Sequence, residues 1–200
     1  MTPPRPYVLG LTGSIGMGKS TTAAMFRDEG VPVWDADATV HRLYAPGGAA
    51  VPRVAALVPG VVRGSAVDRA ALREALEADP SLFPRLEAVV HPLVAEDRAR
   101  FLAGAEGDVV VLDVPLLFER GIEGECDGVA VASAPPEVQM ARILARPGMD
   151  RARAAMLLAR QVPDGHKRAR ADWVIPTDTL DGTRAAVRVI LREIRERQDA

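Results

Sequence analysis

Cysteine is nearly absent from this chain, since Cys126 is the only one in 200 residues. One cysteine cannot form a disulfide within the chain, and a chain of this length needs no such staple to support a core. A long uncharged apolar run after the N-terminus is also lacking, which argues against a secretory signal and a membrane span. These absences predict a cytoplasmic protein with no membrane partner.

A strong excess of charge of either sign is lacking as well. The formal net charge is −2, whereas proteins that bind nucleic acid or membrane surfaces usually need a pronounced basic face. We expect no nucleic-acid partner, and we expect the chain to act as a monomer. With 48% apolar residues, the chain suits one α/β core with an insertion, and two fully separate domains would be cramped.

Lysine is scarce, and one of the few lysines stands in a glycine-rich segment. Lys19 and Lys167 are the only lysines among 25 basic residues. The segment from Val8 to Thr22, VLGLTGSIGMGKSTT, contains G-x-x-x-x-G-K-[ST], the P-loop that binds nucleotide phosphates. A glycine-rich turn before an amphipathic helix is the alternative. It is disfavoured because strand, loop and helix occur in the required order.

The P-loop predicts how a nucleotide is held. Glycines let backbone N–H groups approach phosphate oxygens, Lys19 supplies a cation, and the helix that begins near it directs its N-terminal dipole at the same anion. Ser20 offers a hydroxyl to Mg²⁺. The residues expected to bind the nucleotide are Gly13, Ser14, Ile15, Gly16, Met17, Gly18, Lys19, Ser20 and Thr21.

Short apolar segments alternate with helical patterns along the chain. Strands are expected at residues 7–11, 31–34, 109–112, 128–132 and 171–175, with helices between them and a last helix at 183–197. Such alternation implies a parallel sheet with right-handed crossovers. The predicted fold class is therefore α/β, a P-loop NTPase three-layer sandwich with a five-stranded parallel sheet.

The stretch after the second strand differs in composition. From Pro46-Gly47-Gly48 it shows little strand character, and its apolar residues are spaced by three and four, which predicts short amphipathic helices. His91-Pro92-Leu93 is expected to interrupt this helical pattern. We assign residues 38–104 to a helical insertion, and residues 1–37 with 105–200 to the nucleotide-binding core.

Acidic residues follow two of the expected strands, at the edge where open α/β sheets bind ligands. Asp35 and Asp37 come after the second strand, and they either serve catalysis or metal binding or cap the next helix. Asp113 ends an apolar strand, as a Walker B acid does, and is expected to hold a water on Mg²⁺. Ser20, Asp35 and Asp113 are thus the candidate metal ligands.

Basic residues of the insertion give further candidates. Arg69 and Arg73 lie four residues apart, on one face of a helix that Asp68 is placed to cap. They either clamp an anionic substrate or form a solvated surface. His91 is a capping, core or catalytic histidine.

The most basic part of the chain lies within residues 137–170. No aromatic residue is interleaved there, so a base-stacking surface is not expected. A lid that closes over ATP phosphates is the favoured use, because charge on a transferring phosphoryl group needs cations. A solvated helix pair is the alternative. The basic residues are Arg142, Arg146, Arg151, Arg153, Arg160, Lys167, Arg168 and Arg170.

The P-loop alone does not fix the reaction. A GTPase would be expected to show an N-K-x-D segment, which this chain lacks, and motor ATPases are usually longer. The small size, the helical insertion and the basic lid favour a small-molecule kinase that uses ATP and Mg²⁺. A nucleoside or nucleotide kinase and a nucleotide-binding regulatory ATPase remain alternatives. Release of ADP that depends on a small acceptor would identify a kinase.

Short motifs, ordered along nearly the whole chain, resemble one family. They are the P-loop, D-A-D at 35–37, D-R-x-x-L-R at 68–73, H-P-L at 91–93, V-P-L-L-F-E at 114–119, Q-x-x-R at 139–142, Gln161 and A-D-x-V-I at 171–175. In this order they resemble the dephospho-CoA kinase family, which finishes coenzyme A synthesis. One departure follows Ile175, where the family commonly has D-N-x-G and this chain has Pro176 to Thr179.

The resemblance implies that ATP phosphorylates the ribose 3′-hydroxyl of dephospho-CoA and that the insertion binds CoA. It implies Asp37 as the catalytic base and Arg142 as a lid cation, acting with Lys19. The residues implied to contact the acceptor are Asp35, Asp37, Arg69, His91, Pro115 and Leu116.

Overall fold

The computed structural model describes residues 5–199, which divide into two compact units. The first unit comprises the described residues up to Trp34 and from Ala105 onward, and the second is Asp35–Gly104. Each unit has a hydrophobic cluster of its own.

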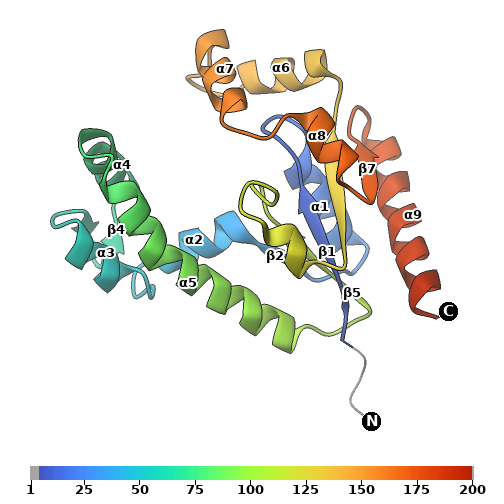
Figure 1. Cartoon of the computed structure of the whole chain (residues 1–200), viewed down its shortest axis with the longest axis horizontal. Helices are drawn as coiled ribbons and strands as arrows, with labels where there is room; N and C mark the ends of the chain where they lie inside the picture. The colour runs from blue at the N-terminus through green and yellow to red at the C-terminus, as the bar shows by residue number, and fades with distance from the viewer. Residues whose placement is uncertain (1–4, 200) are drawn as a thin grey trace. The chain divides into compact units, whose positions relative to one another are not determined.

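The first unit is built on a five-stranded sheet with the strand order β2-β5-β1-β6-β7 (Figure 1). Strand β1 pairs in parallel with β5 and with β6, and β6 pairs in parallel with β7. The predicted α/β class with a five-stranded parallel sheet is confirmed. The strands are β1 (Tyr7–Thr12), β2 (Val33–Asp35), β5 (Val109–Asp113), β6 (Gly128–Ser133) and β7 (Trp173–Pro176).

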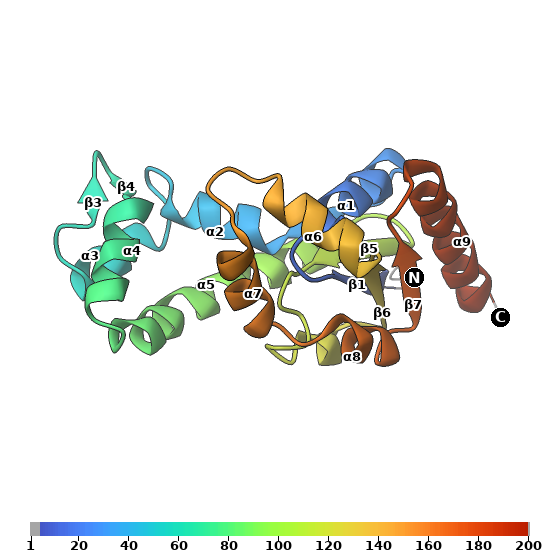
Figure 2. The same cartoon turned by 90° about the horizontal axis from the view of Figure 1, so that it is seen from above.

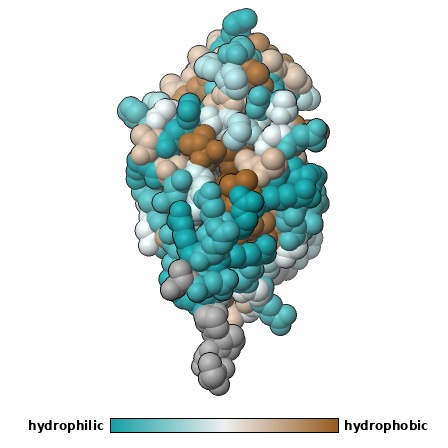
Figure 3. Space-filling model, turned by 90° about the vertical axis from the view of Figure 1, so that its right-hand side faces the viewer, coloured by the Kyte–Doolittle hydropathy of each residue, from teal (hydrophilic) through white to brown (hydrophobic). Residues whose placement is uncertain are grey.

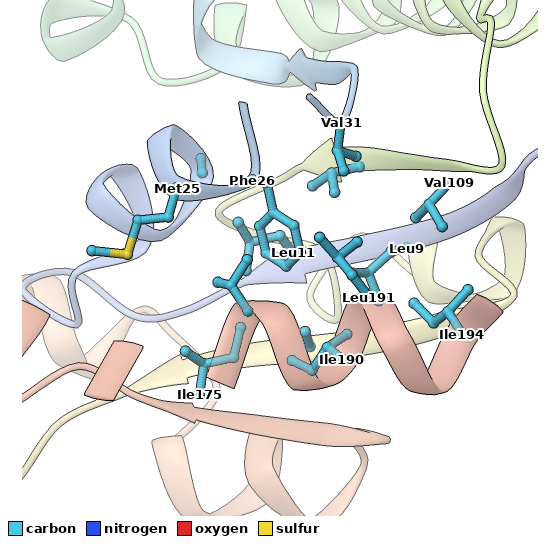
Figure 4. Packing of buried hydrophobic residues seen from close by; sticks show 14 residues of the cluster. Leu9, Leu11, Met25, Phe26, Val31, Val109, Ile175, Ile190, Leu191 and Ile194 are labelled. Carbon is cyan, nitrogen blue, oxygen red and sulfur yellow. The ribbon is translucent and has the colours of Figure 1, made fainter. Parts of the chain in front are cut away.

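Helices α1 (Lys19–Asp28) and α9 (Leu180–Gln198) supply the core on one face of this sheet. Side chains alternate along a strand, so Leu9 and Leu11 of β1 both point to this face. Figure 4 shows Phe26 of α1 close to Leu11 and Leu191. The Phe26 side chain is fully buried. Burial of such a side chain contributes roughly 1.5–3 kcal/mol, so this cluster anchors the helix that begins at the P-loop.

The opposite face of β1 is covered at close range by the loop after β5. A Cβ atom on Gly10 would lie 2.7 Å from Cδ1 of Leu117 and 2.8 Å from Sγ of Cys126. A side chain at residue 10 would therefore force Leu117 and Cys126 of this loop to shift. This region also contains η1 (Ile122–Glu125) and α8 (Asp164–Ala169), while α6 (Pro136–Leu144) and α7 (Arg151–Ala159) precede α8 in the chain.

The surface on the side where α9 is drawn is mainly hydrophilic. Figure 3 shows this side with a small hydrophobic area surrounded by hydrophilic residues. The exposed large apolar side chains of β7 and α9 are Val174, Leu180 and Val189. Among the described residues, no helix combines the length and the apolar character that crossing a bilayer requires.

The second unit is mainly helical, as predicted. Figure 2 shows a short hairpin beside two of its helices. The hairpin turns at Gly64 and Ser65, whose φ values of 54° and 69° suit a two-residue turn between antiparallel strands. The elements are α2 (Ala36–Tyr44), α3 (Val51–Leu57), β3 (Val62–Arg63), β4 (Ala66–Val67), α4 (Arg69–Ala78) and α5 (Leu82–Gly104).

The predicted interruption at His91-Pro92-Leu93 is wrong, because α5 runs unbroken through it for 23 residues. Pro92 removes one backbone donor and costs about 3 kcal/mol or more inside a helix. The helix nevertheless continues because Leu86, Val90 and Leu93 are buried in the cluster of the second unit. Tertiary packing here outweighs the local preference of proline.

Candidate active site

The P-loop connects β1 to α1, as the motif predicts. Gly16 and Gly18 have φ values of 80° and 82°, a left-handed conformation that favours glycine. A Cβ on Gly16 would lie 2.8 Å from the carbonyl oxygen of Gln139. These positions therefore need glycine both for their backbone conformation and for the close approach of neighbouring atoms.

Lys19 and Asp113 lie together at the mouth of this loop. Nζ of Lys19 is 2.6 Å from Oδ1 of Asp113, whose side chain is only 3% exposed. The contact follows from the sheet, since Asp113 ends β5 and is in register with Leu11 of the neighbouring β1. The structure thus brings together the P-loop lysine and the predicted Walker B acid.

Three side chains from distant parts of the chain hold the outer side of the loop. Nε2 of Gln139 donates to the carbonyl of Ile15 at 2.8 Å, and the Ile15 N–H donates to Oε1 of Gln161 at 3.0 Å. The hydroxyl of Thr177 donates to the carbonyl of Met17 at 2.8 Å. The two glutamines belong to motifs that carried the family resemblance, whereas the contact of Thr177 was not foreseen.

Arg142 is held beside the P-loop by Thr177. Its Nη2 donates to the Thr177 carbonyl at 2.6 Å, and its Nη1 donates to the Thr177 hydroxyl at 3.2 Å. A Cβ built on Gly18 would lie 3.3 Å from Nη1 of Arg142. The guanidinium expected to serve as a lid cation is therefore already fixed next to the loop.

Two basic residues of the predicted lid are paired with acidic side chains, and one of them is buried. Lys167 is fully buried, with Nζ 2.9 Å from Oε1 of Glu119. Burial raises the pKa of Glu119, but Lys167 and the Val162 N–H that donates to Oε1 outweigh it, so that the pKa is lowered overall. Arg170 pairs with Glu123. The buried Lys167 therefore fits neither a phosphate-facing lid cation nor a solvated helix surface.

The predicted metal ligands have different surroundings. Ser20 is exposed in the first turn of α1, and Asp113 is paired with Lys19. Asp35 accepts a hydrogen bond of 2.9 Å from the Ala38 N–H and so caps α2. Among the described residues, no group of three or more His, Cys, Asp or Glu side chains is placed to hold a metal by itself. Hydroxyl and carboxylate oxygens are the hard ligands that suit Mg²⁺ together with phosphate.

In the second unit, α2 and α4 bring polar residues together. Asp37 and His41 are one turn apart on α2 and share a face. Nη1 of Arg69 contacts Nε2 of His41, and because a guanidinium only donates, this nitrogen accepts. Asp68 caps α4 through the N–H groups of Ala70 and Ala71, as predicted. His41 was missed, although its spacing from Asp37 was the available signal.

The other residues predicted to contact the phosphoryl acceptor have polar contacts within their own units. Nε2 of His91 lies 3.6 Å from Oε1 of Glu87, one turn earlier on α5, and the side chain is 47% exposed. The capping and core alternatives for His91 are therefore wrong, since this residue lies inside α5 on an exposed face. The Pro115 carbonyl accepts from the Thr12 hydroxyl at 3.1 Å, and the Leu116 carbonyl accepts from the Arg120 N–H.

The parallel sheet, the P-loop after β1 and the acid at the end of β5 define the class: this is a P-loop nucleotide-binding protein. The sequence model of the dephospho-CoA kinase family matches residues 7–181. The dephospho-CoA kinase of Cereibacter sphaeroides is 60% identical over 98% of this chain and 100% of its own length. That of Jannaschia sp. is 56% identical over 95% of this chain and 98% of its own. A solved structure from Thermus thermophilus has a TM-score of 0.83 and 36% identity, covering 95% of this chain and 98% of its own. The chain belongs to the dephospho-CoA kinase family.

Proposed function

We propose that this chain transfers the γ-phosphoryl group of ATP to the ribose 3′-hydroxyl of dephospho-CoA, with ATP bound by the first unit and the acceptor by the second. ATP-dependent phosphorylation of dephospho-CoA, the last step of coenzyme A synthesis, is the activity of the family to which the chain belongs. The observation that carries the proposal is a P-loop whose Lys19 is held against Asp113, in a chain that matches this family over most of its length.

Asp37 is proposed as the general base. Its carboxylate accepts the proton of the 3′-hydroxyl while that oxygen bonds to the γ-phosphorus, and the bond from the γ-phosphorus to the β–γ bridging oxygen breaks to release ADP. The proton then passes to solvent. Asp37 is exposed in the first turn of α2, two residues after β2 ends at the ligand-binding edge of the sheet, which supports this role.

Charge on the transferring group is offset by cations of the first unit. Lys19 contacts the phosphates directly, and Arg142 adds positive charge beside Gly18. Mg²⁺ would be held through Ser20, Asp113 and Asp35, and when bound it would supply positive charge to the phosphates. Lys19 would then divide its interactions between Asp113 and phosphate.

The acceptor is proposed to bind to the insertion, residues 38–104. Arg69 is the leading candidate for a phosphate contact, because its contact with His41 fixes its direction on the exposed side of α4. His91, Pro115 and Leu116 are further acceptor contacts in this proposal, as is Asp35.

The chain supplies both binding units itself, which supports a monomeric enzyme. We further propose that it acts in the cytoplasm, without nucleic-acid or membrane partners.

The lid is proposed to be narrower than residues 137–170. Gln139 and Arg142 at its start and Gln161 and Lys167 near its end are bonded to the rest of the first unit. The intervening residues 145–160 carry exposed cations that suit closure over phosphates. These cations are Arg146, Arg151, Arg153 and Arg160.

The test is ADP release by the purified chain with ATP and Mg²⁺, comparing dephospho-CoA, adenosine and shikimate as acceptors, with the product identified by mass spectrometry. We expect release that depends on dephospho-CoA and a product with one added phosphoryl group. Lys19→Met should lower kcat by about 10²- to 10³-fold. Equal release with every acceptor, or release that only a protein partner stimulates, would refute the proposal.

A further inference from the structure

Thr177 is a buried polar residue directly after β7, and its polar atoms join three other parts of the first unit. It is 6% exposed, its N–H donates to the Ser133 carbonyl at 2.9 Å, and its carbonyl accepts from Arg142. Its hydroxyl lies 2.8 Å from the Met17 carbonyl and 3.3 Å from the Ser133 carbonyl. Because Arg142 can only donate, it uses a lone pair of this hydroxyl, and the single hydroxyl proton remains for a carbonyl, the nearer being that of Met17.

The Met17 carbonyl matters because of the peptide bond to which it belongs. The carbonyl of Met17 and the N–H of Gly18 form one planar trans unit, so they point in opposite directions. A bond that fixes the carbonyl on the outer side of the loop therefore turns the Gly18 N–H to the inner side. In a P-loop, the inner side is where backbone N–H groups contact phosphate.

The Met17–Gly18 peptide needs a constraint from elsewhere in the protein, because its own two residues do little to restrict its rotation. Gly18 has a φ of 82° and no side chain, so rotation of the peptide meets little steric resistance. Gln139 acts in the same way two peptide units earlier, where its bond to the Ile15 carbonyl fixes the direction of the Gly16 N–H. Thr177 and Gln139 thus constrain two successive glycine amides of the loop.

We propose that Thr177 is a positioning residue for nucleotide binding, whose hydroxyl holds the Met17–Gly18 peptide in the orientation that presents the Gly18 N–H to phosphate. Arg142 supports it by occupying the hydroxyl lone pair, so that the proton is directed at Met17. This inference rests on the proposed function, since the phosphates concerned are those of ATP or ADP. Thr177 would thus contribute to nucleotide binding although its hydroxyl bonds only to other groups of the protein.

The experiment compares three variants by calorimetric titration with ADP and with ATP. Thr177→Val keeps the side-chain shape but lacks the hydroxyl, and we expect the Kd for both nucleotides to rise about tenfold, since Gly18 loses its fixed orientation. Thr177→Ser keeps the hydroxyl and should stay within about twofold of wild type. Thr179→Val is the matched control, because Thr179 is exposed and its hydroxyl caps α9; this change should lower stability and leave Kd unchanged.

A Kd for Thr177→Val within about twofold of wild type would overturn the inference, as would an equal loss in Thr177→Ser. If Thr177→Val does not fold, Thr177→Ala compared with Thr177→Ser makes the same test of the hydroxyl. The KM for dephospho-CoA should change far less than the Kd for ATP, whereas a general structural defect would change both. Failure of the proposed function has a different signature, namely nucleotide binding without acceptor-dependent ADP release.

Discussion

The buried pair of Lys167 and Glu119 allows a sharp prediction for the variant Lys167→Met. Methionine retains most of the apolar stem of lysine, so little cavity forms, but the ammonium group 2.9 Å from Oε1 of Glu119 is lost. Glu119 then remains as a charge whose side chain is only 15% exposed, with the Val162 N–H as a remaining donor. The variant should therefore be destabilised through an uncompensated carboxylate.

The expected magnitude follows from the burial of the two partners. Removing one partner of a buried ion pair costs about 3–5 kcal/mol. We expect the lower end, about 3 kcal/mol, because Glu119 keeps a backbone donor and some contact with water. For a chain of this size, each kcal/mol lowers Tm by roughly 2–4 °C, so Tm should fall by roughly 6–12 °C.

Denaturation by urea, followed by tryptophan fluorescence, measures this loss in the unit concerned, since Trp34 and Trp173 both belong to the first unit. The matched control is Arg192→Met, which breaks a surface pair with Glu196 whose side chains are 66% and 69% exposed. That change should cost less than about 1 kcal/mol. If both variants lose the same free energy of unfolding, the Lys167–Glu119 pair contributes no more than a surface pair, and the reasoning is refuted.

The same pair predicts a dependence on pH. Because the pKa of Glu119 is lowered from its ordinary value of 4.5, its contribution to stability is complete above that value and declines as pH falls through the lower, folded-state pKa. Lys167→Met removes a main cause of the lowering. The variant then holds a largely buried carboxylate that protonation stabilises, so the difference in unfolding free energy between wild type and variant should shrink as pH falls, which denaturation series from pH 7 downward would measure.

Three further predictions concern the reaction. Asp37→Asn should lower kcat by about 10²- to 10⁴-fold with the Kd for ATP within a few-fold, whereas surviving turnover with Mg²⁺-dependent loss of ATP binding would make Asp37 a metal residue. Arg69→Ala should raise the KM for dephospho-CoA well above any change in the KM for ATP, and more than Arg73→Ala does; equal effects on both substrates would indicate a folding role. Hydrogen exchange in residues 145–160 should slow when an ATP analogue and dephospho-CoA are both added, and unchanged exchange would indicate a rigid, solvated α7.

The features that sequence revealed are those encoded by residues close together in the chain. The P-loop requires glycines, a lysine and a hydroxyl at fixed spacing, and the cap at Asp68 needs only the helix that follows it. Asp113 was predictable because an apolar strand that ends in an acid places that acid at the sheet edge. The α/β class was predictable for the same reason, because the alternation of apolar segments and helical patterns is also read from neighbouring residues.

The features that sequence missed depend on contacts between distant residues. Pro92 predicts an interruption by local preference, yet the packing of α5 overrides it. Thr177 contacts Met17 across 160 positions of sequence, and no spacing rule connects the two. Lys167 lies in a basic stretch that suggests solvent exposure, but its charge is compensated by Glu119 from another loop. In each case the outcome depends on which elements the fold brings into contact.

The contact of β1 with the loop after β5 restricts which substitutions the chain can accept. Since a Cβ on Gly10 would meet the side-chain ends of Leu117 and Cys126, a methyl group at position 10 requires these side chains to shift or to be smaller. The three sites should therefore vary together among functional sequences, and a change at one of them should be rescued by a compensating change at another. The lone cysteine is in this sense one part of a three-residue packing unit that lies directly beneath the strand leading into the P-loop.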